Sequence, residues 1–85
     1  MTNNELLKKQ IIYRSAHRGS KEMDILLGDF VKKHITSFNN KDLKDLEKIL
    51  SVDDEILYRW YFNKMDNKKI SVNKVSNLLK NFKIG

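Results

Sequence analysis

The stretch His17-Arg18-Gly19-Ser20-Lys21-Glu22-Met23-Asp24 decides how this chain folds, because it lies between two helical patterns and interrupts both. The chain has no proline and only three glycines, so Gly19 is its best internal turn signal. Arg18, Glu22 and Asp24 surround this glycine and lie on no obvious apolar face. We expect a short charged loop here, carried between two helices, with the remaining segments as its scaffold.

Apolar residues recur at helical spacing on both sides of the loop. The strongest pattern follows it, where Met23, Leu27 and Phe30 recur at intervals of four and three residues. We predict an all-α chain, one domain over residues 1–85, folded as a single compact bundle of about five short helices. The expected helices span residues 3–18, 20–38, 41–50, 53–64 and 71–82.

Several single residues carry expectations within this bundle. Residues that favour helix N-termini precede the later helices: Ser20, Asn39 or Asn40, Ser51 and Ser71. Gly28 lies inside the second helix, where glycine costs about 1 kcal/mol relative to alanine, and we attribute it to close approach of another helix. His34 is expected to be half-buried and bonded to a neighbour. One stripe cannot bury all the aromatic residues of the fourth helix, so we expect Tyr58 or Phe62 to reach the surface.

Composition excludes several kinds of site. With no cysteine, the chain has no disulfide, no thiolate zinc site and no cysteine nucleophile, and its two histidines lie too far apart to suggest a structural metal. No apolar run approaches the roughly 20 residues that cross a bilayer, and we see neither a signal nor a transit segment. We expect a cytoplasmic bacterial protein, or a mitochondrial matrix protein if this is a processed eukaryotic form.

Charge is distributed unevenly. The net charge is +6, and residues 67–85 carry five lysines and no acidic residue, whereas Asp53, Asp54 and Glu55 form an acidic patch. A small basic helix-turn-helix protein that binds nucleic acid is therefore one alternative, with residues 72–77 as its recognition segment. The acidic patch would repel phosphate, which argues against it. A protein-docking module that uses the charged loop is the other alternative.

Self-contained catalysis is not expected. Glu22 and Asp24 are two residues apart, so on a helix they do not face each other. Ser15 or Ser20 beside His17 would supply a nucleophile and a base, but no orienting acid or oxyanion donor accompanies them. The glycines stand alone and form no phosphate-binding loop. We therefore predict that this chain is not an enzyme.

Two blocks of sequence resemble a known family. Residues 13–24, with Arg18, Gly19 and Glu22, resemble the Arg-Gly-x-x-Glu signature of the succinate dehydrogenase assembly factor 2 family. Residues 50–60 are similar to its Asp-Asp-x-x-Leu-Tyr-x-Trp segment. The resemblance covers roughly residues 5–65. The chain departs from the family pattern at His17, where members often have a second basic residue, and at Glu55, where they frequently have proline.

The resemblance implies a non-enzymatic, chaperone-like assembly factor with a five-helix fold. Its partner would be the flavoprotein subunit of succinate dehydrogenase, or of fumarate reductase in some bacteria, and it would promote covalent attachment of FAD to a histidine of that subunit. Four residues would bind the partner: Arg18, Gly19, Glu22 and Asp24. Four more would be secondary partner-binding or structural residues: Asp53, Asp54, Tyr58 and Trp60.

The same resemblance implies further expectations. The chain itself would bind no cofactor, no metal and no nucleic acid, would not insert into a membrane, and would be a monomer when free. Gly19 would let the partner backbone approach closely. The Arg18 guanidinium would offer donors to the partner, and Glu22 would accept partner donors or orient Arg18. We assign no role to the basic segment from residue 67 onward.

Overall fold

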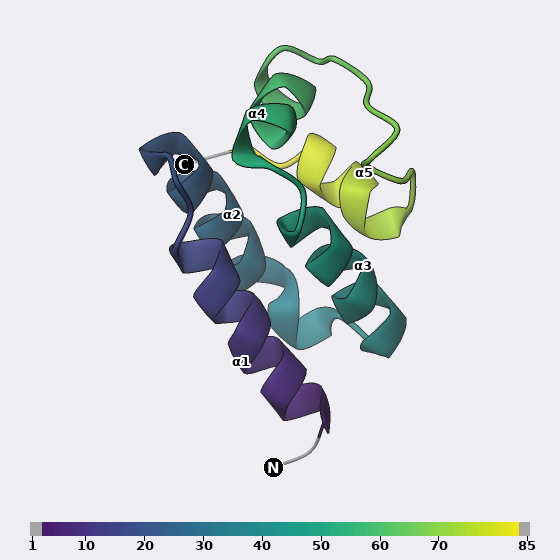
Figure 1. Ribbon diagram of the computed structural model, residues 1–85. Coiled ribbons are helices and arrows are strands. Elements are labelled where there is room, and N and C mark those ends of the chain that lie inside the picture. Colours follow the sequence, from purple (N-terminus) through teal and green to yellow (C-terminus); the bar gives the residue numbers. More distant parts are fainter. Residues whose placement is uncertain (1–2, 84–85) are drawn as a thin grey trace.

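The computed structural model describes residues 3–83, and in these residues five α-helices and one 3-10 helix follow one another without a strand (Figure 1). The elements are α1 (Asn3–Ala16), α2 (Lys21–His34), η1 (Ile35–Ser37), α3 (Asn40–Leu50), α4 (Asp54–Phe62) and α5 (Lys74–Lys80). The predicted all-α architecture of about five short helices is therefore confirmed.

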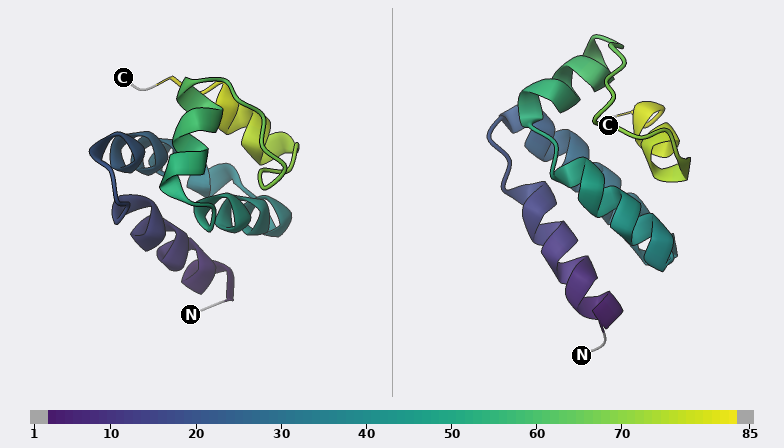
Figure 2. Two further views of the ribbon diagram at one scale, coloured as in Figure 1. Left: turned by 45° about the horizontal axis from the view of Figure 1, so that its top comes forward. Right: turned by 45° about the vertical axis from the view of Figure 1, so that its right-hand side comes forward.

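The helices do not pack simply in sequence order, because α1 contacts both α2 and α3, and α3 contacts α5. α1 and α2 form an antiparallel hairpin, and α3 packs against α1. α5 packs against α3, whereas α4 stands across the bundle at the end where α1 and α2 are joined (Figure 2). This placement brings the start of α4 to the charged loop, although the two are far apart in the sequence.

The core forms around the stripe predicted for α2. Met23, Leu27 and Phe30 are at most 1% exposed, and Leu26 and Val31 join them. The other helices contribute buried aliphatic and aromatic residues to the same cluster: Ile11, Leu43, Leu46, Ile49, Leu50, Leu57, Trp60, Tyr61, Val75 and Leu79. Burial of these apolar side chains supplies the main favourable term for folding.

Helix ends follow side-chain caps. Ser20 caps α2 as expected, since its Oγ accepts from the Met23 N–H at 3.2 Å. Asn39, rather than Asn40, caps α3 and forms a capping box with Asp42. The expectation that Ser71 caps the last helix is wrong, because Asn73 caps it.

Asn73 forms a capping box with Ser76, so α5 begins at Lys74, three residues later than expected. Ser51 does not cap α4 either. Its Oγ donates to the Lys48 carbonyl, and Asp53 occupies the N-cap position without a side-chain cap bond.

The second helix is shorter than the residues 20–38 expected for it. α2 ends at His34 and tightens into η1, and Phe38 then adopts an extended conformation. α1 likewise ends at Ala16, two residues before the expected boundary, because the loop begins at His17. Arg18 bonds to Asp24 and Asp54, as described below, and residues 17 and 18 accordingly belong to the loop and not to α1.

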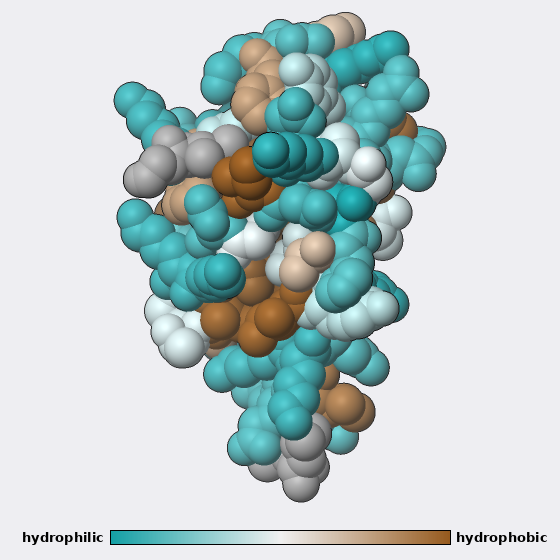
Figure 3. Space-filling view, turned by 90° about the vertical axis from the view of Figure 1, so that its left-hand side faces the viewer, coloured by the Kyte–Doolittle hydropathy of each residue, from teal (hydrophilic) through white to brown (hydrophobic). Residues whose placement is uncertain are grey.

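Gly28 does not lie where another helix approaches closely. A Cβ at this position would meet nothing within 4 Å among the described residues, so the close-approach explanation is wrong. Gly28 instead lies in a shallow hollow between α1 and α2, together with Ile12, Ala16 and Ile25. Both isoleucines are more than 40% exposed. Hydrophobic side chains gather among polar ones on the side of the molecule that is on the left in Figure 1 (Figure 3).

Aromatic side chains divide between core and surface. His34 is half-buried, as expected, but within residues 3–83 its ring forms no hydrogen bond; it stacks on Phe38 with the centroids 5.7 Å apart and contacts Phe30 at 4.8 Å. Tyr58 and Phe62 are 40% and 38% exposed and pack against each other at 4.6 Å. The prediction that one of them reaches the surface therefore holds for both.

No helix in the described part of the chain is long and apolar enough to cross a bilayer.

A buried carboxylate joins α3 to α5. Asp42 is 5% exposed, and its Oδ2 lies 3.1 Å from the Lys74 Nζ and 3.3 Å from the Asn39 N–H. Burial alone would raise the pKa of Asp42, but Lys74 and the Asn39 N–H outweigh it and hold the pKa below its ordinary value.

Acid should weaken the fold through Asp42. A carboxyl whose pKa is lowered by folding contributes stability above its unfolded pKa of about 3.9, and this contribution is lost as the pH falls through the folded pKa. Between about pH 5 and pH 3 the melting temperature of the wild type should therefore fall more steeply than that of Asp42→Asn. Asp45→Asn removes a charge from the same helix and should keep the wild-type slope. Equal slopes for the wild type and Asp42→Asn would contradict this expectation.

His34 should add a second pH dependence. Its burial and the positive charge of Lys33 lower the pKa of His34, so the folded chain resists its protonation. Stability should then be greatest above the unfolded pKa of about 6.5 and decrease as the pH falls below it. Circular dichroism melts of His34→Phe should lack this component, whereas His17→Gln, which retains His34, should show it. A wild type whose melting temperature is constant from pH 7.5 to pH 5 would refute the expectation.

Candidate functional site

The main-chain amides of the loop between α1 and α2 donate hydrogen bonds to two carboxylates, in addition to the cap that Ser20 forms. The Arg18 N–H donates to Asp24 Oδ1 at 2.6 Å, so the first turn of α2 reaches back over the loop. The Gly19 N–H donates in the other direction, to Asp54 Oδ2 at 2.7 Å. Two carboxylates from different helices thus bind two successive amide groups. This fixes the path of residues 17–20.

The Arg18 side chain turns into the molecule. Its Nη1 donates to the Leu50 carbonyl at 2.6 Å and its Nη2 to the Val52 carbonyl at 3.0 Å. Its Nε lies 2.7 Å and its Nη2 2.5 Å from Asp54 Oδ1. The side chain is only 11% exposed. The guanidinium therefore occupies the junction between α3 and α4, and we call these contacts the Arg18–Asp54 latch.

Helix ends explain why a cation and a carboxylate suit this junction. Leu50 is the last residue of α3, where the final carbonyls have no partner within the helix. Arg18 supplies a donor and a positive charge at that negative end of the helix dipole. Asp54 is the first residue of α4, where the positive end of the dipole favours a carboxylate. The latch satisfies groups that the two helices cannot satisfy themselves.

The latch joins the two sequence blocks singled out above. Arg18 and Gly19 belong to the first, and Asp54 belongs to the second, 36 residues after Arg18. Their spacing in the sequence gave no sign of contact. Periodicity places each residue near a helix end but does not say which ends meet, so the sequence analysis missed this pairing.

Glu22 does not orient Arg18, contrary to one expectation. It is exposed in the first turn of α2, and within residues 3–83 it forms no ion pair or hydrogen bond. Arg18 pairs with Asp54 instead. Most of the Arg18 donors that were expected to face the partner are occupied inside the chain, because each of the three nitrogens of its guanidinium has an acceptor there.

The other expected site residues occupy different environments. Asp53 is exposed beside the latch, and Asp24 is half-buried with Arg18. Trp60 is 5% exposed and belongs to the core. Tyr58 lines a hollow of about 390 Å³ together with Ser20, Asp54, Glu55, Arg59 and Asn63. This hollow lies directly beside the latch.

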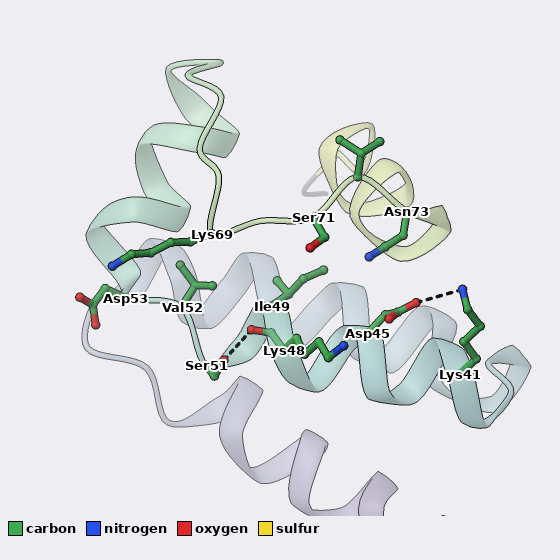
Figure 4. A pocket seen from close by; sticks show the side chains of 11 residues that line it. Lys41, Asp45, Lys48, Ile49, Ser51, Val52, Asp53, Lys69, Ser71 and Asn73 are labelled. Carbon is green, nitrogen blue, oxygen red and sulfur yellow. Dashed lines mark hydrogen bonds and ion pairs between the residues drawn. The ribbon is translucent and has the colours of Figure 1, made fainter.

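A larger hollow lies elsewhere, between α3 and residues 69–73, with a volume of about 570 Å³ (Figure 4). Lys48 and Lys69 reach along it, and Lys41 pairs with Asp45 at 3.7 Å at one end. Positive and negative groups alternate around it, and it contains none of the residues of the first sequence block. Its size alone does not identify it as the functional site.

No catalytic constellation forms around the loop. The His17 Nδ1 lies 2.8 Å from the Tyr13 carbonyl, and the His17 ring stacks on Tyr13. The Ser15 Oγ donates to the Ile12 carbonyl at 2.8 Å. In the described part of the chain, no three His, Cys, Asp or Glu residues are placed to hold a metal ion. What the site offers is a rigid loop with exposed groups around it, which suits binding of another macromolecule.

Comparison with known proteins finds a family that matches most of the chain. A family model described as "Flavinator of succinate dehydrogenase" matches residues 9–83. "FAD assembly factor SdhE" of Wigglesworthia glossinidia brevipalpis is 30% identical over 76 residues, which are 89% of this chain and 90% of that protein. The protein of the same name from Acetobacter pasteurianus is 34% identical over 58 residues, 68% of this chain and 53% of that one.

A mitochondrial relative is also similar. "Succinate dehydrogenase assembly factor 2, mitochondrial" of Meyerozyma guilliermondii is 36% identical over 56 residues, 66% of this chain and 42% of that protein. The chain therefore spans about half the length of several curated relatives that it matches. No solved structure matches it significantly.

The latch should contribute strongly to stability. Arg18→Ala would leave Asp54 and two carbonyls without their partner, and we expect a loss of about 3 kcal/mol in the free energy of unfolding. Arg59→Ala is the matched control, because Arg59 pairs with Glu55 at 2.7 Å on the open surface, and it should lose less than about 1 kcal/mol. Urea titrations followed by circular dichroism would measure both losses. Equal, small losses would show that the latch is energetically no different from an exposed pair.

Proposed function

The chain belongs to the family of succinate dehydrogenase flavinators, and from this premise we propose that it promotes covalent attachment of FAD to the flavoprotein subunit of succinate dehydrogenase. The observation that carries the proposal is the match over residues 9–83, which includes both the Arg18–Gly19 loop and Asp54. The nucleic-acid-binding alternative gains no support from the family or from the names of the relatives.

The proposed role is that of an assembly factor and not of an enzyme. The reacting groups, the flavin and the histidine that receives it, would both belong to the partner. The factor would hold the flavoprotein in a conformation that brings these groups together, which is catalysis by positioning. A rigid loop suits this role, because a positioning surface must not move when the partner binds.

The proposed partner-binding site is the loop of Arg18 and Gly19 together with Glu22 and Asp24, in which some residues would touch the partner and others would hold the loop in shape. Two features support it. Gly19 and Glu22 are exposed, and Glu22 has no competing ion pair or hydrogen bond within residues 3–83. The exposed neighbours Asp53 and Tyr58 would extend the contact beside the loop, where a hollow already lies. Trp60 would act from the core, as a structural residue.

Four further proposals concern the cofactor, the oligomeric state, the compartment and a second partner. The chain would carry no FAD of its own, with the cofactor remaining on the flavoprotein. It would act as a monomer, in the bacterial cytoplasm or in the mitochondrial matrix, wherever its partner subunit is assembled. Fumarate reductase, whose flavoprotein performs related chemistry, would be a second partner in some bacteria.

Flavinylation of the cognate flavoprotein subunit tests the function directly. The subunit is expressed alone, with the wild type, with Glu22→Gln, or with Asp29→Asn, and covalent flavin is read from in-gel fluorescence. We expect the wild type to raise the signal, Glu22→Gln to reduce it several-fold, and the control Asp29→Asn, which neutralises another exposed carboxylate of α2, to match the wild type.

Two outcomes would count against the proposal. Flavin attachment that is equal with and without the wild-type factor would refute the function. Equal signals for Glu22→Gln and Asp29→Asn would leave the function intact and remove Glu22 from the site. Circular dichroism melts should show melting temperatures close to the wild type for both variants, since within residues 3–83 neither carboxylate has an ion pair or hydrogen bond and only Glu22 has a weak interaction with the helix dipole.

A further inference from the structure

We propose that Asp54 positions the Arg18–Gly19 loop for the flavoprotein. Arg18 then acts only through Asp54 and through the carbonyls of Leu50 and Val52, without touching the partner. This inference rests on the proposed function, because it assigns roles within the proposed binding site. It divides that site into residues that hold the loop and residues that meet the partner.

The donors of Arg18 support the second part of this assignment, that Arg18 does not touch the partner. A guanidinium has five N–H donors. Nε and Nη2 bind Asp54, Nη1 binds the Leu50 carbonyl, and Nη2 also binds the Val52 carbonyl. These four bonds leave one N–H on Nη1 without an acceptor among the described residues, so a partner carboxylate could gain a two-pronged contact with Arg18 only by displacing Asp54 or the Leu50 carbonyl. Such a displacement would leave Asp54 or the end of α3 unsatisfied, which is strongly unfavourable.

The acceptors of Asp54 support the first part, that Asp54 positions the loop. One carboxylate oxygen binds the Arg18 side chain and the other binds the Gly19 N–H. Asp54 is therefore the one described side chain that bonds both the guanidinium and the main chain of the loop. Asp24 holds the Arg18 N–H from the opposite side, at 2.6 Å. The loop is fixed between α2 and α4.

The absence of a side chain at position 19 also suits the contact with Asp54. A Cβ built on Gly19 would lie 3.3 Å from Asp54 Oδ2, closer than most such contacts. A side chain at this position would therefore push either the loop or Asp54 away and would lengthen the bond from the Gly19 N–H. The glycine serves the internal contact with Asp54 as well as an approaching partner.

Double-mutant cycles on partner affinity test the proposal. The full-length chain and its variants are titrated calorimetrically with the purified flavoprotein subunit, at a temperature where circular dichroism shows every variant folded. The variants are Arg18→Lys, Asp54→Asn, the double variant, and each single variant combined with Glu22→Gln. Asp29→Asn is the control for loss of an exposed carboxylate.

If Arg18 acts through Asp54, the two latch variants should weaken binding by a similar factor, about tenfold, and the double variant should be no weaker than either. Glu22→Gln should multiply its own factor onto each latch variant, because it meets the partner independently. A wild-type affinity for Asp54→Asn together with weakened binding by Arg18→Lys would overturn the proposal, since Arg18 would then be recognised by the partner itself.

A second measurement separates this proposal from the proposed function. Amide hydrogen exchange at Gly19, followed by NMR on the free chain, reports the bond to Asp54 directly. We expect Asp54→Asn to accelerate this exchange by about tenfold, through weaker binding of the amide by a neutral acceptor, and Asp29→Asn to leave it unchanged. Unchanged exchange in Asp54→Asn would overturn the positioning role even if the partner binds. Absence of binding by the wild type would instead refute the proposed function.

Discussion

A single guanidinium, that of Arg18, lies where four helix ends meet, and the arrangement of this protein depends on that contact. Arg18 leaves the end of α1, its amide is held by the first turn of α2, and its side chain bonds the end of α3 and the start of α4. Each of these helices has polar groups at its end that it cannot satisfy alone. Because one residue satisfies several of them, the position of α4 across the bundle and the path of the exposed loop are set together.

Local physical chemistry allowed much of the fold to be predicted from the sequence. The apolar spacing of Met23, Leu27 and Phe30 gave the central helix and its buried face, and the short polar side chain of Ser20 gave its start. Helix ends were predicted less accurately, because several nearby residues can compete for the same N-cap position. Asn73 overrode Ser71 through a reciprocal bond with Ser76, which spacing alone does not reveal. Gly28 was misassigned because a helical pattern does not tell a crowded glycine from an open one.

The candidate site shows the corresponding limit. Its loop, its exposed Glu22 and its family could be read from short motifs. The partner of Arg18 could not, because the sequence offers Glu22 four residues away and Asp54 thirty-six residues away, and nothing in the periodicity of either block chooses between them. Burial of polar groups decides the choice. When Arg18 pairs with Asp54, the carbonyls of Leu50 and Val52 and the amide of Gly19 are also hydrogen-bonded. Pairing with Glu22 would have left these groups unsatisfied.

The latch also makes the shape of the proposed binding surface depend on complete folding. The α1–α2 hairpin can form from local contacts, but the loop acquires its fixed path only when the junction of α3 and α4 has docked against it. A chain in which the second half is unfolded would retain the Arg18–Gly19 sequence without its shape. In the proposed role, only a fully folded copy of the chain would present the loop to another protein in its fixed conformation.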